Sequence, residues 1–228
     1  MCGHCITEAA IWKGLRKIIN TPACTTILYK AIHIAYRINN FWTCIPAYKN
    51  QELCPRCHFI VDIDHILTAY MAELASLIWN LAQETWPDTL KLWLNVSLGL
   101  ILAGGTLTTP EEVESGQNRN KDKEARILRK STKRGRGRLL QLLVSESAHL
   151  IWVRSCINKC SHTQGEIMSR WLRAINSWLI DDKIIAMKIH CERTPLNLVK
   201  STWARTYRRM VSSPETGFTI DRFWWVGE

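Results

Sequence analysis

The sequence predicts an all-α protein, on three observations. Apolar residues recur every three or four positions along most of the 228 residues, which is the spacing of one helix face. Threonine–proline pairs, Thr21–Pro22 and Thr194–Pro195, stand where two of these patterns begin, and proline is common at the first position of a helix. Strand-like and helix-like segments do not alternate, which argues against a parallel α/β sheet. Hydrophobic residues make up 46% of the chain, enough for a real core.

The first part of the chain predicts helices interrupted by one loop. Ile11, Leu15 and Ile18 share a face of the first helix, whereas Pro46 and Pro55 break the helical spacing further on. The expected segments are a helix over 7–20, a helix over 22–38, an ordered loop over 40–57, a helix over 64–86 and a helix over 90–105. Together these form a predicted helical region, 1–105.

Residues 106–138 predict a basic flexible linker. The segment opens with threonine, proline, serine and glycine, and it ends in a run from Arg119 to Arg138 that holds ten basic residues against two acidic ones. This composition is typical of a solvated linker. The alternative is a segment that contacts nucleic acid, because clustered lysine and arginine bind phosphates.

A second helical region is expected over 139–228. Trp171, Ile175 and Trp178 share a face of a helix over 166–190, and a last helix begins near Pro195. The expected architecture is therefore two packed helical parts joined by the basic linker.

Composition also bounds location and partners. A net charge of +10 predicts attraction to polyanions. We find no secretory signal, and nine cysteines spread through helical segments indicate reduced thiols, so we expect an intracellular protein of the nucleus or cytoplasm. The longest apolar run, Leu92–Gly104, is shorter than the roughly 20 residues that span a bilayer, so no membrane is expected as a partner.

We expect no enzyme activity from this chain. It contains no nucleophile elbow, no phosphate-binding P-loop and no HExxH motif. Two-metal chemistry on nucleic acids needs several converging carboxylates. Pairs such as Asp181 and Asp182 are interpreted instead as residues that cap or flank helices.

The stretch CPRCHFIVDIDHILTAY, residues 54–70, carries most of a zinc site. Cys54 and Cys57 form a C-x₂-C pair, and His65 follows in the first turn of a predicted helix. Two thiolates and an imidazole suit zinc, which takes four ligands in a tetrahedron. For the fourth, Cys44 is a better candidate than His58 or water, because His58 adjoins Cys57. A working site, a decayed site and a coincidence all remain open at this point.

A second C-x₂-C pair, Cys2 and Cys5, has no later partner at finger spacing. It is interpreted as part of the terminus, with the alternative that it lends a ligand to the main site.

The run FWTCIPAYKNQELCPRC…DHILTAY…LIWNLA resembles the zinc-binding region found beside the reverse transcriptase and RNase H domains of retrotransposon polyproteins, especially those of mushroom-forming fungi. The resemblance covers about four fifths of the chain, and includes apolar positions that a metal site alone would not require. The matching residues are Phe41, Trp42, Ile45, Pro46, Tyr48, Cys54, Cys57, Asp64, His65, Ile66, Leu67, Ile78, Trp79, Leu81 and Ala82.

The resemblance implies a detached, non-catalytic part of a polyprotein, with the polymerase and RNase H carboxylates outside this chain. It implies zinc as the cofactor and other parts of the polyprotein as partners. One departure concerns the metal: Tyr70 stands where the family has its fourth ligand, a cysteine.

The leading functional expectation is non-specific contact with RNA or DNA. The alternatives are a protein-interaction or scaffold module and a transposon remnant without function. The candidate nucleic-acid contacts are Arg129, Lys130, Lys133, Arg134, Arg136, Arg138, Arg205, Arg208 and Arg209.

Overall fold

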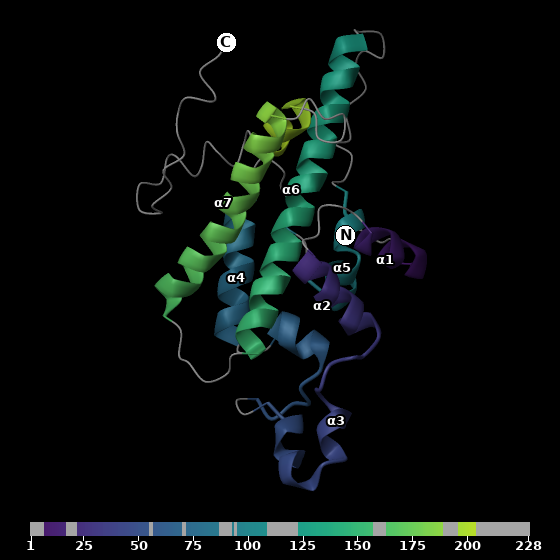
Figure 1. Ribbon diagram of the computed structural model, residues 1–228, viewed down its shortest axis with the longest axis vertical. Helices are drawn as coiled ribbons and strands as arrows, with labels where there is room; N and C mark the ends of the chain where they lie inside the picture. Colours follow the sequence, from purple (N-terminus) through teal and green to yellow (C-terminus); the bar gives the residue numbers. More distant parts are fainter. Residues whose placement is uncertain are drawn as a thin grey trace.

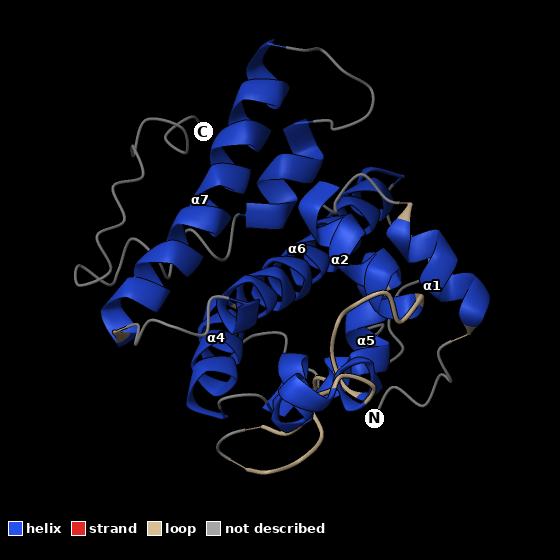
Figure 2. Cartoon of the chain, turned by 60° about the horizontal axis from the view of Figure 1, so that its bottom comes forward, coloured by secondary structure: helices blue, strands red, loops and turns tan. Residues whose placement is uncertain are grey.

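The all-α prediction is confirmed in the computed structural model (Figure 1). The structure describes residues 7–16, 22–54, 57–69, 72–86, 93, 95–108, 123–156, 163–188 and 196–203, with the backbone alone described at 40, 72, 123–131, 187 and 188. Across these ranges there is no strand, and the single extended pairing is an antiparallel bridge between Leu53 and Ile60 (Figure 2).

The first two helices begin at residues 8 and 22, close to the predicted starts at 7 and 22, whereas the helix predicted to begin at 90 begins at 98. Thr7 accepts the backbone N–H of Ala10 at 3.3 Å and so caps the first helix, as threonine commonly does. In chain order the elements are α1 (Glu8–Leu15), α2 (Pro22–Ile32), α3 (Asn40–Thr43), the 3₁₀ helix η1 (Pro46–Glu52), the π-helical turn η2 (His65–Ala69), α4 (Ala72–Thr85), α5 (Leu98–Leu102), the 3₁₀ turn η4 (Gly104–Thr106), α6 (Lys123–Cys156) and α7 (Gln164–Lys188). Residues 196–203 form one more helical segment.

Helix α6 is the central element. It contacts α2, α4, α5 and α7, and Figure 1 shows it running along the bundle between α7 and the N-terminal helices. One hydrophobic core joins Leu28 and Ile78 of the first predicted region to Leu143 and Ile175 of the second. The two predicted helical parts therefore share one core.

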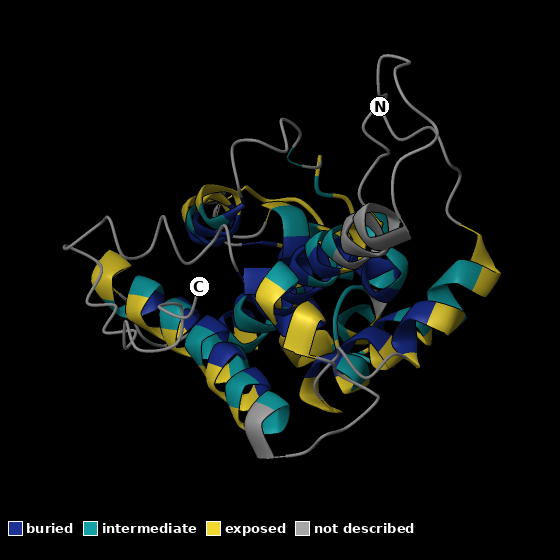
Figure 3. Ribbon diagram, turned by 90° about the horizontal axis from the view of Figure 1, so that it is seen from above, coloured by how far each residue is buried: buried dark blue, intermediate teal, exposed yellow. Residues whose placement is uncertain are grey.

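Burial along α7 follows the predicted helical spacing. Trp171, Ile175 and Leu179 are buried, whereas Arg173 and Ser177 between them are exposed. Figure 3 shows the same banding of buried and exposed positions along the helices. Within the described residues, no helix combines the length and the hydropathy needed to cross a bilayer.

The prediction of a flexible linker over 106–138 is wrong for residues 123–138, which form the first half of α6. Lysine and arginine are good helix formers, so a basic run is compatible with a helix. The glycines that suggested a linker have another role: a Cβ at Gly135 would lie 2.5 Å from the carbonyl carbon of Ser201. Glycine is needed there because the segment 196–203 crosses α6 in direct contact. Residues 109–122 lie outside the described part of the chain.

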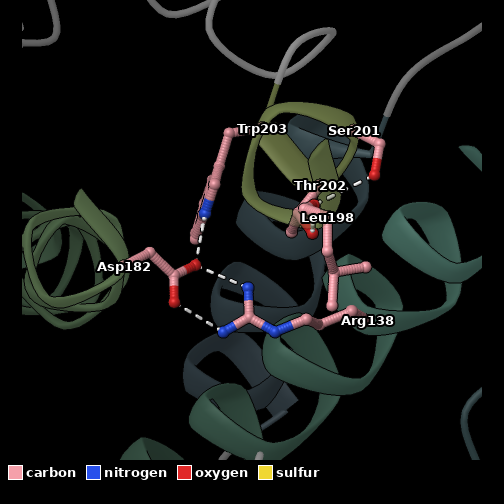
Figure 4. A network of polar contacts seen from close by, with 6 residues as sticks. All are labelled: Arg138, Asp182, Leu198, Ser201, Thr202 and Trp203. Carbon is pink, nitrogen blue, oxygen red and sulfur yellow. Dashed lines mark hydrogen bonds and ion pairs between the residues drawn. The ribbon is translucent and has the colours of Figure 1, made fainter. Parts of the chain in front are cut away.

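A buried polar network joins three helical elements (Figure 4). The Arg138 guanidinium of α6 donates two hydrogen bonds to the Asp182 carboxylate of α7, at 2.5 and 2.7 Å. The Trp203 indole N–H donates to the same carboxylate at 2.7 Å. Asp182 is only 2% exposed, so its charge depends on these donors rather than on water. Arg138, expected to contact nucleic acid, is instead committed to Asp182, and Asp182 lies inside α7 rather than at a helix end.

Replacing Asp182 by alanine is expected to lower the free energy of unfolding by about 3 to 5 kcal/mol, because the buried Arg138 charge would lose its partner. The adjacent exposed Asp181 provides a matched control, and Asp181→Ala should change stability by less than about 0.5 kcal/mol. Urea unfolding followed by circular dichroism at 222 nm measures both. Equal midpoints for the two variants would contradict a structural role for the network.

Candidate metal centre

The zinc-like motif lies in a small lobe that projects from the bundle. We define the projecting lobe as residues 40–54 and 57–64; Figure 1 shows it at the bottom of the molecule, around α3. Inside it, α3 packs against η1, and the Trp42 ring lies 5.0 Å from Phe41 and 5.8 Å from Tyr48 between ring centroids. The matched FW and Y positions of the motif therefore form one aromatic cluster that supports the loop.

A tight hairpin brings the two cysteines together. Cys54 N–H donates to the Phe59 carbonyl at 2.8 Å, and His58 N–H donates back to the Cys54 carbonyl at 2.9 Å. The Leu53–Ile60 bridge closes the hairpin. His58 adopts φ 58°, in the left-handed region, which lets the chain reverse directly after Cys57. The C-x₂-C spacing thus places both sulfurs on one turn.

His65 is positioned by the core rather than by the hairpin. The Asp62 carboxylate accepts the His65 backbone N–H at 2.7 Å and so caps the turn η2. The next residues, Ile66 and Leu67, are buried, and the Trp79 indole N–H of α4 donates to the Leu67 carbonyl at 3.0 Å. The imidazole is therefore presented from a turn that is anchored on α4.

The ligand atoms of Cys54, Cys57 and His65 all lie within 4.8 Å of one another. Cys57 Sγ is 3.5 Å from His65 Nε2. Zinc–sulfur bonds of about 2.3 Å and zinc–nitrogen bonds of about 2.05 Å at a tetrahedral angle would place sulfur and nitrogen about 3.6 Å apart. Both the donor types and their separation therefore fit zinc.

Burial differs among the three ligands. Cys54 is 1% exposed, His65 is half-buried and Cys57 is exposed. The group therefore lies at the surface of the protein, with the Cys54 side turned inward and the Cys57 side turned to solvent.

The structure does not place Cys44 in this group. Cys44 ends α3, where its backbone N–H donates to the Trp42 carbonyl and its exposed sulfur lies 3.9 Å from Thr43 Oγ1. Cys44 belongs to a different element from the hairpin, so its closeness to Cys54 in the sequence does not bring it into the group. Tyr70, Cys2 and Cys5 lie outside the described residues. Among the described His, Cys, Asp and Glu residues, Cys54, Cys57 and His65 make up the single such group.

Cys24, another buried thiol, is part of the hydrophobic core. It lies between α2 and α6, where its Sγ donates to the Ser145 carbonyl at 3.5 Å. Burial, with a smaller contribution from Glu146, raises the pKa of this thiol to about 12. Cys24 is therefore a neutral core residue at physiological pH.

The predicted nucleic-acid residues divide into distinct environments. Lys133 and Arg134 are exposed on α6, Arg136 is half-buried, and Arg138 is paired with Asp182. Arg129 and Lys130 belong to α6, with only their backbone described. Arg205, Arg208 and Arg209 lie wholly outside the described residues.

The basic start of α6 and the projecting lobe lie at opposite ends of the molecule (Figure 1). The 34 residues of α6 extend about 50 Å at the rise of an α-helix. The metal group and the basic residues therefore belong to two separate sites.

Comparisons with protein-family models, with curated proteins and with solved structures found no match to this chain.

Sequence reasoning missed two residues that support His65. Asp62 precedes His65 by three positions, which is the spacing of a capping side chain and its N–H partner, so a local signal was present. Trp79 is twelve residues from Leu67, and only the folding of α4 beside η2 brings its indole to that carbonyl.

Asp62→Ala is expected to weaken zinc binding by about tenfold, because the turn that presents His65 loses its cap. Asp64→Ala removes the same charge from the same exposed segment without touching that hydrogen bond, and should change the zinc affinity by less than about twofold. Competition with a chromophoric chelator measures both affinities. The role assigned to Asp62 fails if the two variants lose affinity equally.

Proposed function

We propose that this chain is a non-catalytic zinc-binding module of the reverse transcriptase zinc-binding type, derived from a retrotransposon polyprotein. The observation that supports this proposal is the gathering of Cys54, Cys57 and His65, whose ligand atoms lie within 4.8 Å of one another. The aromatic cluster at the matched motif positions Trp42 and Tyr48 supports it further.

The bound ion would act as a structural cross-link between the hairpin and η2. The Cys54 and Cys57 side chains would hold it from the projecting lobe, and His65 would hold it from the turn anchored by Leu67 and Trp79. Such a cross-link stabilises a fold because the site exists only in the folded chain, so that the binding free energy of the metal adds to the free energy of folding. The lobe has little core of its own, so it gains most from the metal.

Purified protein is expected to retain about one zinc per chain after dialysis, because the three ligands are already gathered. Cys54→Ser should remove the zinc, whereas Cys156→Ser, which changes an exposed thiol outside the group, should retain it. Metal analysis by plasma mass spectrometry gives the ratio. A parent protein without zinc, or equal zinc in both variants, would overturn the proposal.

We extend the proposal to nucleic acid, contacted through the basic start of α6. Lys133 and Arg134 are consecutive exposed residues there, and further lysine and arginine residues precede them in the same helix. Contacts of this kind bind phosphates, depend steeply on salt and carry little sequence information. Arg138 has no part in this interface, because Asp182 holds its guanidinium.

The double variant Lys133→Ala/Arg134→Ala is expected to weaken RNA or DNA binding and to reduce the slope of log affinity against log salt by about 1.5, as two phosphate contacts are lost. Lys30→Ala/Lys49→Ala removes the same charge from exposed positions elsewhere and should leave the slope unchanged. Fluorescence anisotropy over a salt series measures both. The absence of binding at low salt, or equal losses in both variants, rules this interface out.

The exposed apolar side chains of the projecting lobe favour a second candidate function, docking of a protein partner. Phe59 is 71% exposed, and Leu53 and Ile60 on the same hairpin are also exposed, as are Phe41 and Tyr48 nearby. Clustered exposed apolar residues mark interaction surfaces in many soluble proteins. An elution volume that shifts with protein concentration in the parent but not in Phe59→Ser would support docking over nucleic-acid binding.

A further inference from the structure

The group that could hold a metal ion contains three candidate protein ligands. Structural zinc sites are closed by four protein ligands, whereas sites with three protein ligands keep a position for an exogenous ligand. In the described part of the chain the group contains the two thiols of Cys54 and Cys57 and the imidazole of His65, without a fourth histidine, cysteine or carboxylate atom.

The described neighbours that could supply a fourth ligand, the exposed His58 among them, lie outside the group. Cys44 is held at the end of α3 and lies outside the group. The Asp62 carboxylate accepts the His65 backbone N–H, so turning it toward a metal would break the cap of the turn that presents the imidazole. Asp64 is exposed and lies outside the group, although it immediately precedes His65.

The exposure of the group shows from which side a fourth ligand would arrive. Cys54 is buried, whereas the Cys57 side chain reaches solvent and His65 is half-buried. The three candidate ligands come from one hairpin and one adjoining turn, and the group is exposed at Cys57. A small molecule could therefore reach the group from solution on the Cys57 side.

We propose that a zinc ion bound here keeps its fourth coordination position open to solvent. Water or a small soft ligand such as a thiol would fill that position, which the sequence had assigned to Cys44. The inference rests on the zinc binding proposed above. Two thiolates already bound make the ion a soft acceptor, and thiols are the ligand class that such an ion prefers.

An open position gives the site a property that a closed one lacks. A ligand from solution, or a cysteine or histidine from a docked partner, could complete the tetrahedron without displacing a protein ligand. The metal would then contribute to the binding free energy of that ligand, and the absorption spectrum of a coloured metal at the site would change when the ligand binds.

Cobalt(II) replaces zinc in such sites and makes the ligand set visible, because each thiolate contributes a charge-transfer absorption in the near ultraviolet. The experiment uses the full chain, kept reduced by a phosphine rather than a thiol, and loaded with one equivalent of cobalt. Spectra are recorded for the parent, Cys44→Ser and Cys57→Ser, and then during titration with 2-mercaptoethanol, with the cobalt-to-protein ratio checked after desalting.

We expect identical spectra for the parent and Cys44→Ser, whereas Cys57→Ser should lose the charge-transfer absorption, because removing one of the three gathered ligands removes the metal, as expected for Cys54→Ser. Addition of 2-mercaptoethanol should raise the absorption of the parent by about half and shift the visible bands, as a third thiolate enters. Circular dichroism confirms that each variant remains folded.

The inference is overturned if Cys44→Ser loses charge-transfer absorption, or if 2-mercaptoethanol leaves the spectrum of the cobalt-loaded parent unchanged. Either result would mean that protein side chains already fill all four positions. Zinc binding itself would still stand in that case, whereas a chain that binds neither metal would refute the proposed function instead. The two failures are therefore distinguishable.

Discussion

The structure depends on the complete burial of the middle of α6. All ten residues from 139 to 148 are buried, so this part of the helix needs neighbours on every side. Its polar side chains must also find partners, because a buried polar group without a hydrogen bond is costly. Gln141 donates to the Leu107 carbonyl at 2.6 Å, Ser147 accepts from the Trp171 indole at 3.1 Å, and Glu146 accepts from the Trp178 indole at 2.9 Å. These bonds fix α7, and the residue that follows η4, against α6.

Four of the described tryptophans, Trp79, Trp171, Trp178 and Trp203, meet the same constraint. Each indole offers a large apolar surface and one N–H donor, so it can fill the core and satisfy a buried acceptor together. The Trp203 indole N–H donates to the Asp182 carboxylate, and the Trp79 indole N–H donates to the Leu67 carbonyl. The indoles thus act as donors between helices, in addition to packing in the core.

The metal group connects this core to the least buried part of the chain. His65 stands at the start of a turn whose next residues enter the core, whereas Cys54 and Cys57 belong to a hairpin held mainly by its own backbone hydrogen bonds. A metal ion bound by all three would therefore transmit the order of the bundle to the projecting lobe.

Local sequence alone determined the helical class, the starts of α1, α2 and α7 to within two residues, and the Cys54, Cys57 and His65 group that could hold a metal ion, because helix faces, caps and a set of residues within twelve positions depend on short-range spacing. Only the tertiary structure decided which charges are available and where helices end. Arg134 and Arg138 look equivalent in the run KRGRGR, yet one is exposed and the other pairs with Asp182, 44 residues away. Gly135 favoured the prediction of a linker because glycine disfavours helices. In the structure the absence of a side chain at Gly135 lets the segment 196–203 pack directly against α6. Cys44 is close to the hairpin in sequence and remains outside the metal group, because the packing of α3 on η1, rather than distance along the chain, sets its position.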